Sequence, residues 1–157
     1  MLQQKTALEK LMEERKSVRK YNPDFKIPRE EIEHILQQAT SAPSSSNLQP
    51  WRFLVIDDAE QKKELRIAGF NQEQIETSSA IIAVLGDTEM YKNAKQIYDA
   101  NVDLGYMPRE IADMMIANSE AMYSGLSEEV RSNIAHFDAG LCMDIIILVR
   151  IEKMFSR

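Results

Sequence analysis

The stretch SAPSSSNLQPW, residues Ser41 to Trp51, places three consecutive serines, an asparagine and a glutamine close to two prolines. Serine, asparagine and proline favour turns, so they predict that the preceding helix ends here. Glutamine and tryptophan are not turn formers, and the second half of the stretch is less well explained in this way. Loops held between a helix and a strand are also places where ligand contacts concentrate. The residues alone leave both interpretations open, a helix stop and a ligand-binding loop.

Regular secondary structure is predicted on both sides of this stretch. Pro28 suits the start of a helix, and apolar residues at helical spacing continue from Ile32 to Ala39. Trp51 to Asp58 (WRFLVIDD) is rich in aromatic and β-branched residues, which predicts a strand, and Glu60 to Ala68 predicts a helix. The near-continuous apolar run from Ser79 to Asp87 predicts a second strand, buried on both faces.

The rest of the chain is predicted to be mostly helical. Thr6 can cap a helix near the N-terminus, and Met90 to Tyr98 fit one helix. A further helix is expected from Pro108 to Gly125, and Ser127 can cap the next one, whose apolar stripe begins at Phe137. Two strands among many helices predict an α+β or α/β fold with a small sheet.

Length and composition exclude several classes of protein. The 157 residues suffice for one domain, and no linker or repeat divides residues 1–157. The net charge of −6 argues against a nucleic-acid binder, which normally carries a basic excess on one face. The longest apolar run, Ile145 to Val149, is too short to cross a bilayer, so no membrane association is expected.

The cysteines, histidines and glycine motifs of the sequence argue against a disulfide, a metal site and a Rossmann-type NAD site. The single cysteine, Cys142, fits a reducing compartment, so the cytoplasm is the expected location, and its apolar neighbours favour a buried structural thiol. His34 and His136 are far apart and no cluster has metal-ligand spacing, so no metal is expected. Because no G-x-G-x-x-G motif follows either strand, a Rossmann-type NAD site is not expected.

A basic stretch, RKSVR (Arg15 to Arg19), lies between the first two predicted helices. If it is extended, Arg15, Ser17 and Arg19 share one face, and two guanidinium groups beside a hydroxyl suit a phosphate. The alternative is that Arg15 and Lys16 complement the C-terminal end of a helix while the other side chains are solvated. Charge alone favours this alternative, since basic turns are common.

Taken together, these segments resemble a known family. RKSVR, then APSSSNLQPWRF (42–53), then FNQEQI (70–75) before SSAIIAVLGD (78–87) resemble the FMN-dependent nitroreductases in order and spacing. The resemblance extends from about Glu14 to Val149 and includes DAGLCM (138–143), which looks like the start of the family's long central helix. It implies a three-layer α+β fold, with a small mixed sheet flanked by helices, in a homodimer that binds FMN at the subunit interface.

The resemblance also implies roles for individual residues. Arg15 and Ser17 would hold the FMN phosphate, and Lys16 would lie along the ribityl or phosphate part. Arg19 would approach the pyrimidine side of the flavin, where a cation favours the reduced ring. The positions that match the loop meeting the flavin of the partner subunit are Pro43, Ser44, Ser45 and Asn47, with Gln49 ordering that loop. Asn71 matches a position that hydrogen-bonds the ring edge, and Gln72 is a weaker candidate for the same role.

The reaction that the resemblance implies is a ping-pong transfer. NAD(P)H would reduce the flavin and leave, and a nitroaromatic, quinone or enone acceptor would then take the electrons in the same space. The flavin supplies this chemistry, so no catalytic acid, base or nucleophile is expected from the protein.

The resemblance weakens near the C-terminus. From about Asp144 the sequence fits the family poorly, and the family's glycine-bearing loop, further strands and late basic residue do not follow. The expectation is therefore a family member with a shortened C-terminal part, in which exposed sheet edges and a weaker phosphate clamp follow from the missing strands. An alternative stays open: a flavin-binding or non-flavin protein with little or no catalytic activity.

Overall fold

The computed structural model of the chain describes residues 5–155, with side chains described up to residue 149. The chain forms two compact units. Unit 1 contains the chain up to Ala39, Phe53–Ala83 and the chain from Met143 onward, and unit 2 contains Thr40–Arg52 and Val84–Cys142. The single domain expected over residues 1–157 stays a prediction.

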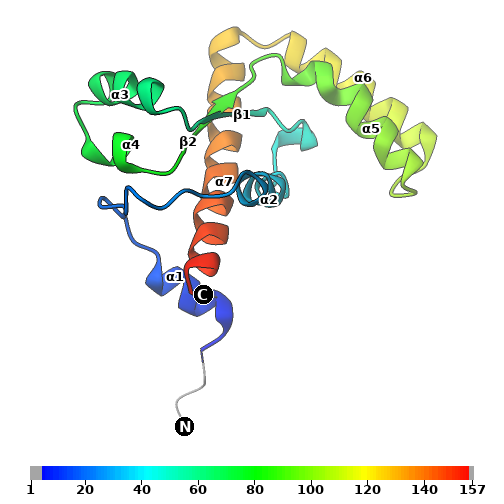
Figure 1. Ribbon diagram of the computed structural model, residues 1–157. Coiled ribbons are helices and arrows are strands. Elements are labelled where there is room, and N and C mark those ends of the chain that lie inside the picture. The colour runs from blue at the N-terminus through cyan, green and yellow to red at the C-terminus, as the bar shows by residue number, and fades with distance from the viewer. Residues whose placement is uncertain (1–4, 156–157) are drawn as a thin grey trace. The chain divides into compact units, whose positions relative to one another are not determined.

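Helices dominate the described residues (Figure 1). In chain order the elements are α1 (Ala7–Glu14), α2 (Arg29–Ala39), the 3₁₀ turn η1 (Ser45–Asn47), β1 (Trp51–Ile56), α3 (Ala59–Ala68), α4 (Glu73–Thr77), β2 (Ile81–Gly86), the 3₁₀ turn η2 (Met90–Asn93), α5 (Ala94–Asp103), α6 (Arg109–Ser124) and α7 (Glu128–Phe155). Many helices and one small sheet confirm the predicted α+β class.

The sheet of the described residues consists of β1 and β2, which are hydrogen-bonded neighbours. The amide of Asp87, just after β2, donates to the carbonyl of Pro50, just before β1, at 2.7 Å, so the strands run antiparallel. Within residues 5–155 the expected mixed sheet is therefore represented by an antiparallel pair. The predicted burial of β2 on both faces is wrong, because its first four residues are half-buried and Leu85 and Gly86 are exposed.

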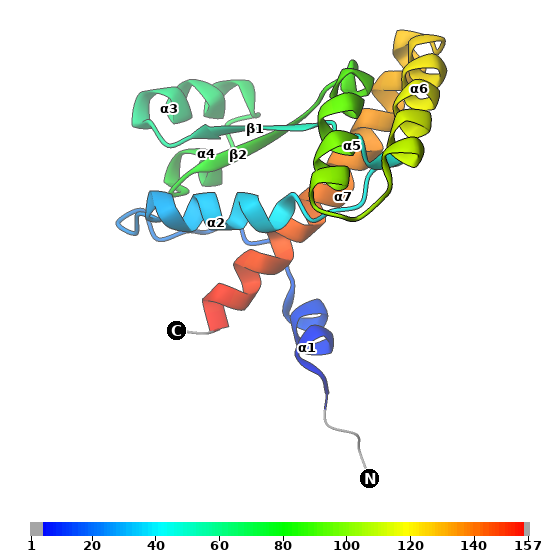
Figure 2. The same ribbon diagram turned by 90° about the vertical axis from the view of Figure 1, so that its right-hand side faces the viewer.

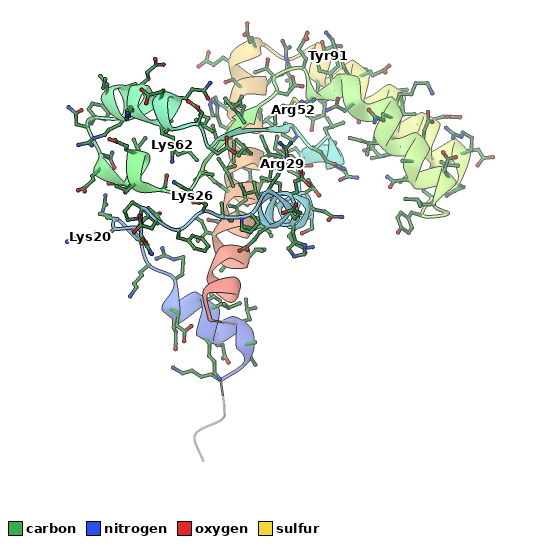
Figure 3. The ribbon with its side chains drawn as sticks, viewed as in Figure 1. Lys20, Lys26, Arg29, Arg52, Lys62 and Tyr91 are labelled. Carbon is green, nitrogen blue, oxygen red and sulfur yellow. The ribbon has the colours of Figure 1, made fainter. Side chains whose placement is uncertain are left out.

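In unit 1, the helices α3 and α4 precede β2. Asp58 caps α3, and its carboxylate accepts from the amide of Gln61 at 2.9 Å. Lys62 of α3 is 2% exposed, and its ammonium donates to the carbonyl of Ser78 at 2.7 Å (Figure 3). Burial of this cation lowers the pKa of Lys62, and the charge of Lys26 adds to the effect. The hydrogen bond ties α3 to the turn that leads into β2.

In unit 2, α5 and α6 lie side by side (Figure 2). Pro108 and Gly125 flank α6 as predicted, while the helix predicted from Met90 to Tyr98 is divided into η2 and the start of α5. The buried side chains of the unit form one apolar cluster, which contains Leu48, Met90, Ala94, Tyr98, Ala112 and Tyr123. Leu48, which belongs to the polar stretch before β1, is therefore buried in this core.

The long helix α7 is strongly apolar. Its stretch Glu128–Val149 has the length and composition of a membrane-spanning helix, and a core helix of a folded protein meets the same criteria. Asp138 lies within this stretch, is 1% exposed and accepts hydrogen bonds from Ser45. A buried carboxylate bonded to a loop indicates that this part of α7 is packed within unit 2. Phe137, predicted for the apolar stripe, is exposed, whereas Cys142 is buried.

Candidate functional site

The polar loop, Pro43 to Gln49 in unit 2, has an unusual backbone. Ser46, Asn47 and Gln49 have φ angles of 49°, 52° and 49°. Residues with a Cβ disfavour this left-handed region by ~1–2 kcal/mol each, and asparagine tolerates it better than most. Such a backbone persists where the surrounding structure holds it, and it is concentrated at functional sites.

Internal hydrogen bonds link the beginning of the polar loop to its end. Ser44 Oγ accepts from the amide of Gln49 at 3.0 Å, and Asn47 Oδ1 accepts from Gln49 Nε2 at 3.3 Å. The amides of Asn47 and Leu48 donate to the carbonyls of Ser44 and Ser45 at 3.0 and 3.1 Å, which forms η1. Gln49 is thus hydrogen-bonded to both Ser44 and Asn47, and its role in ordering the loop for a ligand stays a prediction.

Three side chains from helices of unit 2 also hold the loop. Ser45 donates to Asp138 of α7 twice, from its amide to Oδ2 at 2.9 Å and from Oγ to Oδ1 at 3.1 Å. Tyr98 of α5 donates from its hydroxyl to the carbonyl of Ser46 at 2.8 Å, and the hydroxyl of Tyr123 of α6 is hydrogen-bonded to Ser46 Oγ at 2.9 Å. All three anchors are buried. The helices, rather than the loop's own propensity, therefore impose its conformation.

These bonds decide which groups of the loop can still bind a ligand. Asp138 uses both donors of Ser45, so Ser45 Oγ can enter a further hydrogen bond only as an acceptor. Ser44 Oγ accepts from the Gln49 amide, so its hydroxyl proton is available to donate. Asn47 is exposed, and within residues 5–149 its Nδ2 makes no hydrogen bond. The loop therefore offers both donors and acceptors to a flat, polar-edged molecule.

The basic segment, Arg15 to Arg19 in unit 1, follows directly on α1. Arg15 is the C-cap of α1, and its amide donates to the carbonyl of Leu11 at 3.0 Å. The side chains of the segment are exposed and, in the part of the chain that the structure describes, they form no hydrogen bond or ion pair. Elsewhere in unit 1, Lys5, Arg29 and Lys63 pair with carboxylates. The segment thus has cationic side chains that are available to bind an anion. The alternative, that Arg15 and Lys16 complement the C-terminal end of α1, stays open.

The turn between α3 and α4 carries the last two predicted residues, Asn71 and Gln72. Phe70 and Asn71 have φ angles of 57° and 56°, and the amide of Asn71 donates to the carbonyl of Arg66 at 2.9 Å. Arg66 also pairs with Glu76 of α4 at 2.7 Å, so both helices hold the turn. The side chain of Asn71 is exposed, whereas Gln72 Oε1 already accepts a hydrogen bond from α4.

The predicted site residues fall into groups that belong to different units. Unit 2 brings together the loop residues Pro43, Ser44, Ser45, Asn47 and Gln49. Unit 1 contains Arg15, Lys16, Ser17 and Arg19 in one exposed segment, and Asn71 and Gln72 in one exposed turn. A shared binding cleft for these groups stays a prediction.

The residues that hold the polar loop in shape were not predicted. Tyr98 and Tyr123 lie at apolar positions of their helices. A tyrosine at such a position is expected to be a core residue, so nothing in the sequence assigned them a contact with the loop. Asp138 did carry a signal, because an aspartate between apolar residues of a packed helix needs hydrogen-bond donors when it is buried. Its segment DAGLCM lies well inside α7, which begins at Glu128, so the expectation that this segment starts the helix is wrong.

Comparison with known proteins shows what the chain is similar to. The sequence model of the nitroreductase family matches residues 12–150, which include the basic segment, the polar loop and the α3–α4 turn. The protein named "Putative NAD(P)H nitroreductase YdgI" of Bacillus subtilis is 45% identical over 142 residues, which make up 89% of this chain and 68% of that protein. The "CLA biosynthesis enone reductase" of Lactiplantibacillus plantarum is 29% identical over 138 residues, or 87% of this chain and 62% of that protein.

Solved structures share the fold. The crystal structure described as "a putative nitroreductase in complex with FMN", from Exiguobacterium sibiricum, matches with a TM-score of 0.86 and 40% sequence identity. That match covers 95% of this chain and 72% of the solved chain.

Proposed function

Because the chain belongs to the nitroreductase family, we propose that it is an oxidoreductase that binds FMN and passes electrons from NAD(P)H to an electron-poor acceptor. The observation that carries this proposal is the polar loop, in which Ser46, Asn47 and Gln49 keep a left-handed backbone while buried side chains of three helices hold them. Backbone strain of this kind is maintained where a ligand needs a fixed shape. The FMN complex of the relative from E. sibiricum supports the choice of ligand.

The basic segment fits the anionic end of FMN. A phosphate binds best to charge-assisted donors, and Arg15, Lys16 and Ser17 are exposed donors without partners in the described chain. Arg19 would place a further cation toward the pyrimidine side of the ring. Since reduced flavin tends to carry negative charge on that side, this cation would favour reduction.

The polar loop fits the ring of FMN. The pyrimidine edge of a flavin carries two carbonyl acceptors and one N–H donor. Ser44 can donate and Ser45 Oγ can accept, and the exposed amide of Asn47 can donate as well. Asn71 and, less readily, Gln72 would reach the ring edge from the α3–α4 turn, while Pro43 would contact the ring without a hydrogen bond.

A homodimer would bring the groups together, with the polar loop of one subunit at the flavin held by the basic segment of the other. Exposed apolar side chains on α7 support a partner surface, namely Val130, Phe137, Met143 and Ile147. Isolated exposed apolar residues are normal on a monomer, but several on one helix favour burial against another chain.

Bound FMN would supply the hydride chemistry, so the chain's own residues bind and orient rather than react. The acceptors that we propose are nitroaromatics, quinones and enones, reduced in a ping-pong cycle. The enone reductase among the relatives supports the inclusion of enones. A cytoplasmic location is proposed because the chain has a single cysteine, Cys142, which is buried and has no second cysteine to pair with in a disulfide.

Anaerobic reduction tests the proposed activity. Protein reconstituted with FMN should lose its flavin absorption when NADH or NADPH is added, and the colour should return on adding a quinone or a nitroaromatic. Steady-state rates at several donor and acceptor concentrations should give parallel double-reciprocal lines. Bound flavin that is not reduced by either donor would support the low-activity alternative. Protein that stays colourless with excess FMN would contradict the proposal.

A mixing experiment tests the two-subunit site. One variant carries Arg15→Ala and Arg19→Ala, and the other carries Ser44→Ala and Asn47→Ala. Each alone should bind FMN weakly, but in a co-expressed heterodimer one of the two sites keeps an intact basic segment and an intact polar loop. Recovered FMN binding in the heterodimer is the expected result, and binding no better than that of the separate variants would contradict the arrangement.

A further inference from the structure

We propose that Asp138 is a positioning residue of the flavin site, and that from inside α7 it helps to fix the polar loop in the conformation that binds FMN. This inference rests on the proposed function. Asp138 lies 93 residues from Ser45 in the chain, yet its two oxygens accept the amide and the hydroxyl of Ser45 at 2.9 and 3.1 Å. The carboxylate thus fixes one residue of the loop at two points.

Burying the carboxylate of Asp138 is not expected to stabilise the fold. A carboxylate that is 1% exposed has lost its hydration, which is costly even when hydrogen bonds replace the water. No cation pairs with Asp138 in the part of the chain that the structure describes, and Ser45 is its hydrogen-bond partner there. An apolar residue would fill this position of a packed helix at lower cost. The specific bond to the loop is what the carboxylate provides.

The position of Ser45 explains why this bond matters for the loop. Ser45 comes directly before Ser46 and Asn47, whose left-handed backbone must be held from outside. Tyr98 and Tyr123 hold Ser46 through its carbonyl and hydroxyl, whereas in the described residues the side chain hydrogen-bonded to Ser45 is that of Asp138. Without Asp138 the start of the turn would depend on hydrogen bonds within the loop, such as that from the Leu48 amide to the Ser45 carbonyl, and it would leave the strained conformation more readily. A ligand that binds only one conformation loses apparent affinity in proportion to the population of that conformation.

Three variants test the proposal through FMN affinity. Asp138→Ala removes both hydrogen bonds, and we expect FMN to bind about 30-fold more weakly, because bonds to charged groups are strong and the competent loop population falls. Asp138→Asn should stay within about threefold of the wild type, since its amide oxygen can accept from the Ser45 amide and its NH₂ can donate to Ser45 Oγ. The matched control is Cys142→Ala, at a buried position one turn further along α7.

Hydrogen exchange of the amides of Ser45 and Gln49 provides a readout that needs no flavin. In Asp138→Ala both amides should exchange at least ~10-fold faster, because local opening of the loop exposes them. In Asp138→Asn and Cys142→Ala the two rates should stay at the wild-type level. A general loss of stability would instead change exchange throughout unit 2, including the amides of α5 and α6.

The outcomes separate this inference from the proposed function. Unchanged exchange at Ser45 in Asp138→Ala would overturn the inference, and so would unchanged FMN affinity in a protein that binds FMN. Wild-type protein that binds no FMN would contradict the proposed function and the flavin part of the inference, while exchange would still decide whether Asp138 holds the loop. If Asp138→Ala does not fold, Ser45→Ala removes the hydroxyl bond to Asp138 alone, and exchange of the Gln49 amide is then the readout because Ser45 Oγ is itself a proposed flavin contact. This exchange should be about threefold faster or more, and an unchanged rate would overturn the inference.

Discussion

Replacing Phe70 with glycine is expected to stabilise the chain, although it removes an aromatic side chain. Phe70 lies in the turn between α3 and α4, has a φ of 57° and is 92% exposed. Its side chain therefore contributes almost no burial, while its Cβ opposes the backbone conformation that the turn requires.

The expected gain follows from two opposing terms. Relief of a left-handed backbone at a residue with a Cβ is worth ~1–2 kcal/mol, and the greater freedom of glycine in the unfolded chain costs ~0.5–1 kcal/mol. At the middle of these two ranges Phe70→Gly should therefore be more stable than Phe70→Ala by ~0.75 kcal/mol, because alanine keeps the Cβ. For a chain of this size the difference corresponds to a shift in Tm of ~1–4 °C.

Urea unfolding of Phe70→Ala and Phe70→Gly, followed by circular dichroism, measures the difference. Ile67 of α3 provides the matched control, because it is also strongly exposed, at 74%, but lies in a helix. There the order should reverse, with Ile67→Gly less stable than Ile67→Ala by ~1 kcal/mol. Phe70→Gly that is less stable than Phe70→Ala would refute the strain assigned to this turn.

Three further predictions concern buried groups. Because burial lowers the pKa of Lys62 below its ordinary 10.5, the folded chain binds fewer protons than the unfolded chain between the lowered pKa and 10.5, so stability should rise with pH across that interval. Urea midpoints measured up to pH 10.5 should show this slope in the wild type, and an equal slope in Lys62→Met would contradict the assignment. Tyr98→Phe leaves the carbonyl of Ser46 without its donor and should cost ~1–3 kcal/mol in urea unfolding, whereas a cost below about 0.5 kcal/mol would show that this bond does not hold the loop. Burial raises the pKa of Cys142 to about 11, so a thiol reagent should label it only after unfolding, and rapid labelling of the native protein would refute its burial.

Elements whose ends depend on nearby residues could be predicted from the sequence. Thr6 forms a capping box with Glu9, three residues away, and Pro108 and Gly125 flank α6. The chemistry of such caps lies within one turn of the chain, so composition and spacing are sufficient. The order of the basic segment, the polar loop and the α3–α4 turn was likewise visible in the sequence and led to the correct family.

Features that depend on distant residues could not be predicted. The contact between Asp138 and Ser45 joins segments 93 residues apart, and nothing local to either residue specifies it. Burial of β2 depends on which elements lie beside it, so its apolar run predicted more burial than the strand has. The helix α4 has five residues, which is too short for a periodic signal.

The central claim is that the basic segment and the polar loop hold FMN, and calorimetric titration of FMN into three proteins tests it most directly. These are the wild type, the double variant Arg15→Ala/Arg19→Ala, and Lys10→Ala, which removes an exposed cation of α1. We predict saturable binding by the wild type and by Lys10→Ala with similar affinity, and binding at least ~10-fold weaker by the double variant, because charged hydrogen bonds to the phosphate are lost. Equal affinity in all three proteins, or no binding by the wild type, would contradict the account.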